Sequence, residues 1–420
     1  MEKSPPTIAP TPSAIISDRP QMDESNIAPR RLNPTDESVW GGYLADFFID
    51  PQTIYLNHGS FGITPNRVRL AVQTLQRSIN LNPMDFFLYR LEDELAKTRQ
   101  KLAEFLGTEA GNLALIDNAT YAMSIVVNST LLVAGDQVLI IDQEYEPVRR
   151  MWQQRCAAAG ADLVTFKIPV PLQSPQELID QLIGQVTEKT RILVISHVMS
   201  RTALVMPIAE ICQRLQGSGV AVVVDGPHGP AQLDMNLNQL GCDFYAASCH
   251  KWMSAPLGTG FLFVHPRWQE QIKPLVKGWG RLPPHPVTTW TDHFNWPGTR
   301  DPSHLLAIPS AIDFLEAVGL DNFRARSRYL ASYTESALGE LFLTKPIADR
   351  NQGFYASMAH VPLPQGEWSE LQYRLKQEIG AEVVINRCGD QDFLRVSCHL
   401  YNNTRQIDLL TKSLYILMET

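Results

Sequence analysis

The chain has 420 residues, and 36 Lys and Arg against 44 Asp and Glu give a net charge of −8. This length favours two or three domains. The charge balance lacks the basic excess typical of nucleic-acid binding, and no apolar run approaches the ~20 residues that span a bilayer. The six cysteines form no CxxC or zinc pattern, and the N-terminus lacks an apolar signal segment. We therefore expect a soluble, cytoplasmic protein with reduced thiols, no metal site and no membrane partner.

Residues 1–35 carry seven prolines and little apolar periodicity, which predicts a disordered tail. Residues 66–107 have the pattern of helices and end at a glycine. Apolar strands then alternate with helices, and continuous Val, Ile and Leu runs indicate strands buried on both faces. The fold class is therefore α/β, with a mainly parallel seven-stranded sheet whose strands are expected at 113–117, 136–142, 161–168, 191–198, 220–226, 242–249 and 258–265.

The last part of the chain has a different pattern. A long helical stretch at 309–341 precedes three shorter strand-like pieces at 353–363, 381–386 and 393–402. This indicates a second, smaller α+β domain. We predict a large domain over 65–300 and a small domain formed by 36–64 and 301–420.

Polar side chains gather where the predicted strands end. In open α/β sheets, ligands bind outside the carboxyl ends of the strands. Taken singly, these residues have ordinary explanations, such as a helix cap, a satisfied buried carboxylate or a surface lysine. Together they predict one site, built from Asn118, Ala119, Thr120, Tyr145, Ser196, His197, Asp225, Ser248, His250 and Lys251.

These residue types suit one cofactor. A lysine such as Lys251 forms a Schiff base with a carbonyl compound. A carboxylate such as Asp225 pairs with a pyridinium nitrogen and makes the ring an electron sink. The helix that begins near Asn118 offers an anion site for a phosphate. The combination predicts pyridoxal 5′-phosphate.

At these residues the sequence resembles a known family. The stretches VVVDGPH (222–228), SCHKW (248–252), DNAT (117–120) and QEYEPV (143–148) resemble fold-type I pyridoxal-phosphate enzymes of the class V aminotransferase family. Within that family, the chain is most similar to isopenicillin N epimerase-like proteins over residues 40 to 415. That similarity is carried by YLNHGSFGITP (55–65), SHVMSRTALVMPI (196–208), WPGTRDPS (296–303) and LRVSCHLYNN (394–403).

The resemblance implies a role for each cofactor residue. Lys251 would carry the Schiff base, Asp225 would pair with the ring nitrogen, and His228 would approach the phenolic oxygen. Tyr145 would stack on the ring. The phosphate would be held by Ala119, Thr120, Ser248 and His250.

The resemblance also implies a substrate site and a dimer. Arg395 would clamp the substrate carboxylate through its fork, although a surface-strand arginine is the ordinary alternative. Asn57 and His58 would line the substrate entrance. Thr299 would reach the phosphate of a neighbouring subunit, which implies a homodimer, and Arg300 would contact either substrate or the dimer interface.

The reaction stays open among three outcomes at the Cα of a small amino acid or amino-acid derivative: epimerisation, transamination and carbon–sulfur lysis. Ala203 and Pro227 depart from the family pattern, so substrate specificity is not inherited with the fold. Cys388 lies seven residues before Arg395, too close for the long loop of a cysteine desulfurase, and is interpreted as an ordinary thiol. A nicotinamide enzyme would need GxGxxG, and a metalloenzyme HExxH; neither motif occurs.

Overall fold

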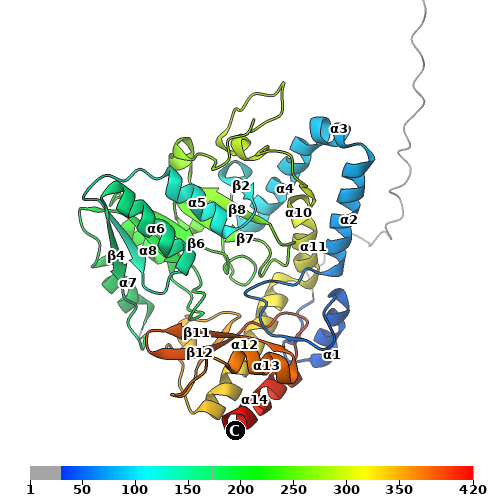
Figure 1. The fold of residues 1–420 in the computed structure, drawn as a ribbon, viewed down its shortest axis with the longest axis vertical. Coiled ribbons are helices and arrows are strands. Elements are labelled where there is room, and N and C mark those ends of the chain that lie inside the picture. The colour runs from blue at the N-terminus through cyan, green and yellow to red at the C-terminus, as the bar shows by residue number, and fades with distance from the viewer. Residues whose placement is uncertain (1–29, 173, 420) are drawn as a thin grey trace, which may run out of the picture.

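The computed structural model describes residues 30–172 and 174–419 (Figure 1). Most of the predicted tail, residues 1–29, lies outside the described residues. Residues 30–35 lie against helix α12 (Leu320–Phe342). The backbone N–H of Leu32 donates to Asn322 at 2.9 Å, and Arg326 donates to the carbonyl of Pro34 at 2.8 Å. The end of the predicted tail is therefore tied to the folded chain.

A seven-stranded sheet forms the larger part of the molecule, as the sequence predicts. Its strand order is β2-β8-β7-β6-β5-β3-β4. Strand β8 runs antiparallel to both of its neighbours, and the other pairs are parallel. The strands are β2 (Leu113–Ile116), β3 (Gln137–Ile141), β4 (Asp162–Phe166), β5 (Thr190–Ser196), β6 (Ala221–Asp225), β7 (Phe244–Ser248) and β8 (Gly260–Val264).

Both faces of this sheet are covered. Side chains alternate between faces along a strand, so Leu139 and Ile141 join one buried apolar cluster whereas Val138 and Ile140 join another. Helices alternate with the strands and supply the covering layers (Figure 1). They are α2 (Asn66–Leu81), α4 (Leu91–Leu106), α5 (Ala119–Ser129), α6 (Glu146–Ala159), α7 (Pro175–Ile183), α8 (Ile208–Leu215), α9 (Leu237–Leu240), α10 (Ser303–Leu306) and α11 (Ile308–Val318).

A smaller antiparallel sheet packed against helices lies at the other end of the molecule (Figure 1). Its antiparallel sheet has the order β11-β12-β9, with β9 (Ala359–Pro362), β11 (Val384–Cys388) and β12 (Gln391–Val396). Strand β1 (Ile54–Tyr55) pairs in parallel with β10 (Ala381–Glu382), which joins an early segment to the late ones. A third apolar cluster packs these strands against α12, α13 (Leu371–Ile379) and α14 (Thr404–Glu419). The exact domain boundaries stay a prediction.

The helical stretch predicted at 309–341 is not continuous. It is divided into α11 and α12 by Gly319, which has φ 84°. Such a φ suits glycine because it has no Cβ to clash. Among the described helices, no single one is long and apolar enough to cross a membrane, although Ser303–Val318 with Leu320–Phe342, bent by 78°, meets the length and composition requirement as a pair.

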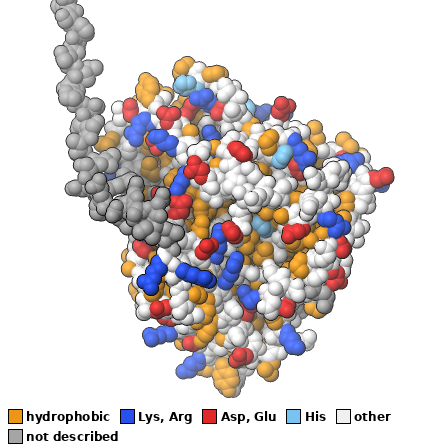
Figure 2. Space-filling model, turned by 180° about the vertical axis from the view of Figure 1, so that it is seen from behind, with side chains coloured by type: hydrophobic (Ala, Val, Ile, Leu, Met, Phe, Trp, Pro, Cys, Tyr) orange, Lys and Arg blue, Asp and Glu red, His pale blue; other side chains and the backbone are white. Residues whose placement is uncertain are grey.

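Acidic and basic side chains are interspersed over the face drawn in Figure 2. This pattern matches the nearly balanced charge counts of the sequence. Of the polar residues predicted at the carboxyl ends of the strands, Asp225, His228 and Ser248 are almost completely buried, whereas Thr120 and Tyr145 are exposed.

Candidate active site

A cavity of about 500 Å³ lies beyond the carboxyl ends of β2, β3, β5, β6 and β7. The parallel course of these strands brings their ends to one edge of the sheet. Segments far apart in sequence therefore meet there. The lining includes nine of the predicted residues: Asn118, Ala119, Thr120, Tyr145, Asp225, His228, Ser248, His250 and Lys251.

One end of the cavity is suited to an anion. Helix α5 begins directly after β2, and the Asn118 side chain caps it by accepting from the N–H of Tyr121 at 2.9 Å. The N–H of Ala119 donates to Ser248 Oγ at 3.0 Å, which ties the ends of β2 and β7 together. Within the described chain, the N–H of Thr120 has no such internal partner, and the buried Nδ1 of His250 has none either. A helix N-terminus with free donors is an anion-binding arrangement.

Lys251 lines the same cavity, next to a histidine. Its Nζ is 3.1 Å from Nε2 of His228. Burial and, to a lesser extent, the charge of Arg395 lower the pKa of Lys251 to about 7, against the opposing effect of Asp225. A lysine with this pKa has a substantial neutral fraction at neutral pH, so its lone pair is available as a nucleophile or base.

Asp225, at the end of β6, is almost completely buried. Burial raises the pKa of its carboxyl, the neighbouring Glu144 raises it further, and Lys251 lowers it. A buried carboxylate of this kind gains from a cationic partner. A protonated ring nitrogen is such a partner.

Glu144 is a buried acid that sequence reasoning missed. Its Oε1 accepts hydrogen bonds from Ser196 Oγ and from the N–H of Tyr145, while Oε2 has no partner among the described residues. Burial raises its pKa to about 7. The sequence offers two acids beside Tyr145, and only the structure distinguishes the buried Glu144 from Glu146, whose side chain is 44% exposed.

Arg395 is a buried cation, not a surface-strand arginine. It lies in the middle of the small antiparallel sheet, on β12, and is 3% exposed. Its guanidinium donates to the carbonyl and hydroxyl of Ser200, to Ser60 Oγ at 2.6 Å and to Asn57 Oδ1 at 3.3 Å. Within the described part of the chain, no carboxylate pairs with it. Burial lowers its pKa to about 10. The arrangement leaves a positive charge without a carboxylate partner among the described residues, next to Ser60 and Ser200, which line the cavity.

His58 is not on the cavity wall. It is fully buried behind the lysine, with Nε2 3.0 Å from the carbonyl of Lys251, Nδ1 2.9 Å from the hydroxyl of Tyr401, and its ring stacked 3.9 Å from that of His399. Burial lowers the pKa of His58 to about 3. This placement favours support of the Lys251 backbone over the predicted contact with substrate.

The N-terminal loop approaches the lysine closely at Gly62. The N–H of Gly62 donates to the carbonyl of His250 at 3.1 Å, and a Cβ there would lie 2.3 Å from that oxygen. Only a glycine permits this approach. It places Ser60 and its neighbours over the cavity.

Thr299 lies apart from the lysine cavity. It is exposed and lines a second hollow with Arg300, whose guanidinium pairs with Asp117. Its predicted contact, the phosphate of a neighbouring subunit, stays a prediction. Asn57 contributes to the site indirectly, because its Oδ1 accepts hydrogen bonds from Arg395 and from Ser60.

Comparison with known proteins places this geometry in a family. The family model "Aminotransferase class-V" matches residues 54–410. The chain belongs to the class V aminotransferase family.

For two relatives, the similarity extends along nearly the whole chain. Isopenicillin N epimerase of Amycolatopsis lactamdurans is 34% identical over 391 residues, covering 90% of this chain and 98% of that protein. The isopenicillin N epimerase of Streptomyces clavuligerus is 32% identical, with coverage of 89% and 97%. A probable chloroplastic L-cysteine desulfhydrase of Arabidopsis thaliana is 28% identical, covering 66% of this chain and 62% of that protein.

Solved structures share the fold. The cystine C-S lyase C-DES, in complex with cysteine persulfide, superposes with a TM-score of 0.75 at 23% identity, covering 87% of this chain and 98% of that one. The cysteine desulfurase CsdA of Escherichia coli gives 0.76 at 21% identity, covering 92% and 99%. These likenesses confirm the predicted fold-type I architecture.

The cofactor of this family, and of this chain, is pyridoxal 5′-phosphate, as the sequence predicts. The donor set around the cavity fits it. Thr120, Ser248 and His250 surround the anion end, where a buried imidazole nitrogen lacks a partner. Asp225 would offer a carboxylate to the ring nitrogen, and Lys251 would offer an amine to the aldehyde.

Proposed function

We propose that this protein is an amino-acid epimerase that uses pyridoxal 5′-phosphate to invert the configuration at Cα. The observation that supports this proposal is the end-to-end similarity to isopenicillin N epimerases, 34% over 98% of one such protein. The bound cofactor supplies an electron sink that makes the Cα–H bond acidic. The proposed substrate class is a small amino acid or an amino-acid derivative with a free α-carboxylate.

The residues of the chain divide the remaining work. Lys251, partly neutral at neutral pH, accepts the Cα proton on Nζ. Arg395 binds the substrate carboxylate and so fixes which bond faces Lys251. Asp225 would hold a positive charge on the ring nitrogen of the bound cofactor, and Tyr145 would lie against the ring. Because Arg395 and Asp225 are nearly completely buried, their charges act with little screening by water.

Carbon–sulfur lysis is the second candidate, favoured by the desulfhydrase among the relatives. A lyase of this kind needs the same lysine and carboxylate clamp but no catalytic thiol. Transamination, which the family's name denotes, needs only that the proton return to the cofactor and not to Cα. The residues described above serve the removal of the Cα proton that all three reactions share, and epimerisation needs in addition a proton donor on the face of Cα opposite Lys251.

A desulfurase mechanism through Cys388 is disfavoured by geometry. Cys388 ends β11 and pairs with Gln391, the first residue of β12, so that only residues 389 and 390 connect the strands. It lines a different cavity from Lys251. Burial raises the pKa of its thiol, whereas a nucleophilic cysteine needs a lowered pKa.

Proton exchange at Cα in deuterium oxide tests the proposal. Purified holoenzyme is incubated with a panel of L-amino acids, and the products are followed by mass and by chiral separation. We expect deuterium at Cα together with the D-enantiomer. Keto-acid formation without racemisation would replace the proposal by transamination, and pyruvate with sulfide from cysteine would replace it by lysis.

The matched control is Lys251→Ala, which should abolish exchange and leave no cofactor attached after borohydride reduction. Exchange that survives this substitution would contradict the role of the lysine.

We also infer a homodimer with Thr299 near the neighbouring subunit's cofactor. The exposed position of Thr299, outside the cavity of its own chain, supports this inference. Analytical ultracentrifugation should give twice the chain mass, and Thr299→Ala should weaken cofactor retention. A monomer with full cofactor content would contradict it. The cytoplasmic location stays a prediction.

A further inference from the structure

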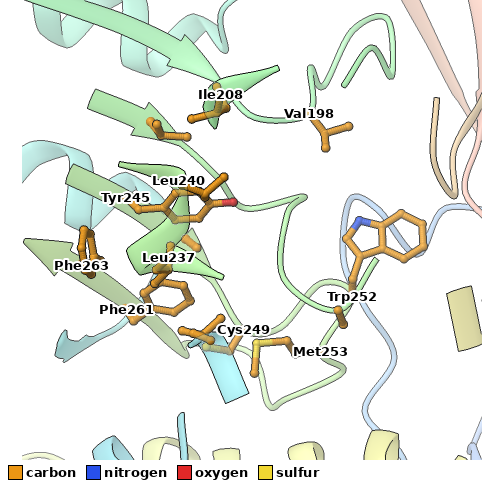
Figure 3. Packing of buried hydrophobic residues seen from close by; sticks show 14 of the residues in the cluster. Val198, Ile208, Leu237, Leu240, Tyr245, Cys249, Trp252, Met253, Phe261 and Phe263 are labelled. Carbon is orange, nitrogen blue, oxygen red and sulfur yellow. The ribbon is translucent and has the colours of Figure 1, made fainter. Parts of the chain in front are cut away.

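Trp252 follows Lys251 directly and is almost completely buried, with 1% of its surface exposed. By burial alone it is an ordinary core aromatic residue. Figure 3 shows its indole to one side of the packed residues, away from Tyr245 and Phe261. Its indole N–H, however, does not face an apolar neighbour. It donates a hydrogen bond to Nδ1 of His228 at 3.2 Å.

This contact restricts where the proton of His228 can reside. An indole N–H only donates, so Nδ1 of His228 must offer its lone pair. In a neutral imidazole the proton then lies on Nε2. Nε2 is the atom that faces Lys251 Nζ at 3.1 Å. The imidazole therefore presents an N–H to the lysine.

The restriction extends to Lys251. An N–H on Nε2 needs an acceptor, and a lysine nitrogen accepts only as the neutral amine, because the ammonium ion has no lone pair. With an ammonium at Lys251, His228 would have to move its proton to Nδ1, where it would meet the N–H of Trp252. With an ammonium at Lys251, a proton on Nε2 of His228 would face the ammonium, and a proton on Nδ1 would face the indole N–H of Trp252. Each of these two arrangements leaves two donors facing each other in a buried site, which is unfavourable.

We propose that Trp252 is a positioning residue that fixes the Nε2–H tautomer of His228 and thereby favours the neutral amine of Lys251. This proposal rests on the role of Lys251 in the proposed function. The same tautomer suits the expected partner of His228 in the holoenzyme, the phenolic oxygen of the cofactor, because an oxygen anion accepts hydrogen bonds.

Other groups facing the pair act in known directions. Burial and the charges of Lys251, Arg395 and His250 lower the pKa of His228 well below its usual range, so the ring stays neutral. Asp225 favours the ammonium form of Lys251, and Arg395 disfavours it. The indole of Trp252 also favours the neutral form of Lys251. This effect depends on one N–H group, which can be removed by substitution without changing any charge.

Trp252→Phe removes that N–H and keeps an aromatic ring. The control is Trp152→Phe on α6, because Trp152 is equally buried and its indole N–H has no partner among the described residues. Full-length protein stripped of cofactor is mixed with pyridoxal 5′-phosphate at a series of pH values, and the rate of capture is followed by visible absorbance. The rate reports the fraction of Lys251 that is neutral.

We expect the wild-type midpoint near pH 7. In Trp252→Phe the midpoint should rise by about one unit, the size of one lost hydrogen-bond constraint, so that capture below the midpoint slows about tenfold. Trp152→Phe should match the wild type. An unchanged midpoint in Trp252→Phe, or an equal shift in Trp152→Phe, overturns the proposal.

A second measurement needs no variant. Nitrogen NMR of the histidine-labelled wild-type protein reports the tautomer of His228, assigned by comparison with His228→Gln. We expect a protonated Nε2 and an unprotonated Nδ1, and the reverse tautomer overturns the proposal. If Lys251→Ala captured cofactor as the wild type does, the proposed function would fail while the tautomer result would stand, so the two failures are distinguishable.

Discussion

Arg395 offers the sharpest test of the substrate site, through the substitution Arg395→Met. Arg395 is 3% exposed, and among the described residues its guanidinium is bound only by neutral oxygens, including those of Ser60 and Ser200. Methionine has a comparable length and no charge, so it removes the carboxylate anchor while filling much of the space. The cofactor residues Asp225 and Lys251 are not altered.

The size of the effect follows from the burial. Truncating one partner of a buried, hydrogen-bonded charge pair costs about 2–4 kcal/mol. At about 1.4 kcal/mol for each factor of ten, kcat/KM should fall about 30- to 1,000-fold. Arg395→Lys should fall in between, because an ammonium keeps the charge but cannot form the two-pronged contact.

The assay compares an amino acid with the matching amine that lacks the α-carboxylate. Cα exchange is measured for both compounds with wild type and with Arg395→Met, and visible absorbance checks that the cofactor is retained. For the wild type, kcat/KM should be lower on the amine than on the amino acid, by the same factor that Arg395→Met loses on the amino acid. Arg395→Met should act on the two compounds at similar rates. If Arg395→Met slowed both compounds equally, the arginine would not bind the carboxylate and the reasoning would be refuted.

Three further substitutions or conditions give independent tests. Asp225→Asn should slow Cα exchange at least about 100-fold, because a neutral amide does not hold charge on the ring nitrogen, while borohydride still fixes the cofactor on Lys251; exchange at the wild-type rate would exclude that role. Cys388→Ser should leave turnover within about twofold of wild type, since the thiol lies in another cavity, and a large loss would revive a desulfurase mechanism. Burial lowers the pKa of His58 and of His360 to about 3, below the unfolded value of 6.5. The unfolded chain therefore binds protons first as the pH falls from 6.5 towards 3, and stability that is complete above pH 6.5 is lost, by about 2 kcal/mol for each ring at pH 5. Urea unfolding at pH 7 and pH 5 should show this loss, and replacing both rings by glutamine should reduce it; an unchanged pH dependence in the double variant would contradict the assignment.

Local sequence was sufficient to place the polar ends of the strands. Asp225 and Ser248 each end a run of apolar residues, and strands buried on both faces are written as such runs. Since parallel strands end at one edge, their terminal residues had to meet. The helix cap at Asn118 was equally predictable from the sequence, because capping depends on residues within one turn.

The sequence by itself therefore determined the sheet, the cofactor and most of the residues around one cavity. Tertiary structure alone decided which polar groups are buried and what they face. Arg395 meets Ser60 across 335 positions of sequence, and His58 lies behind the lysine and not at the entrance. Likewise, nothing local distinguishes Glu144 from Glu146, or shows that the indole of Trp252 reaches His228. Burial and hydrogen-bond partnership are set by packing between distant segments, and a side chain's pKa and tautomer follow from them.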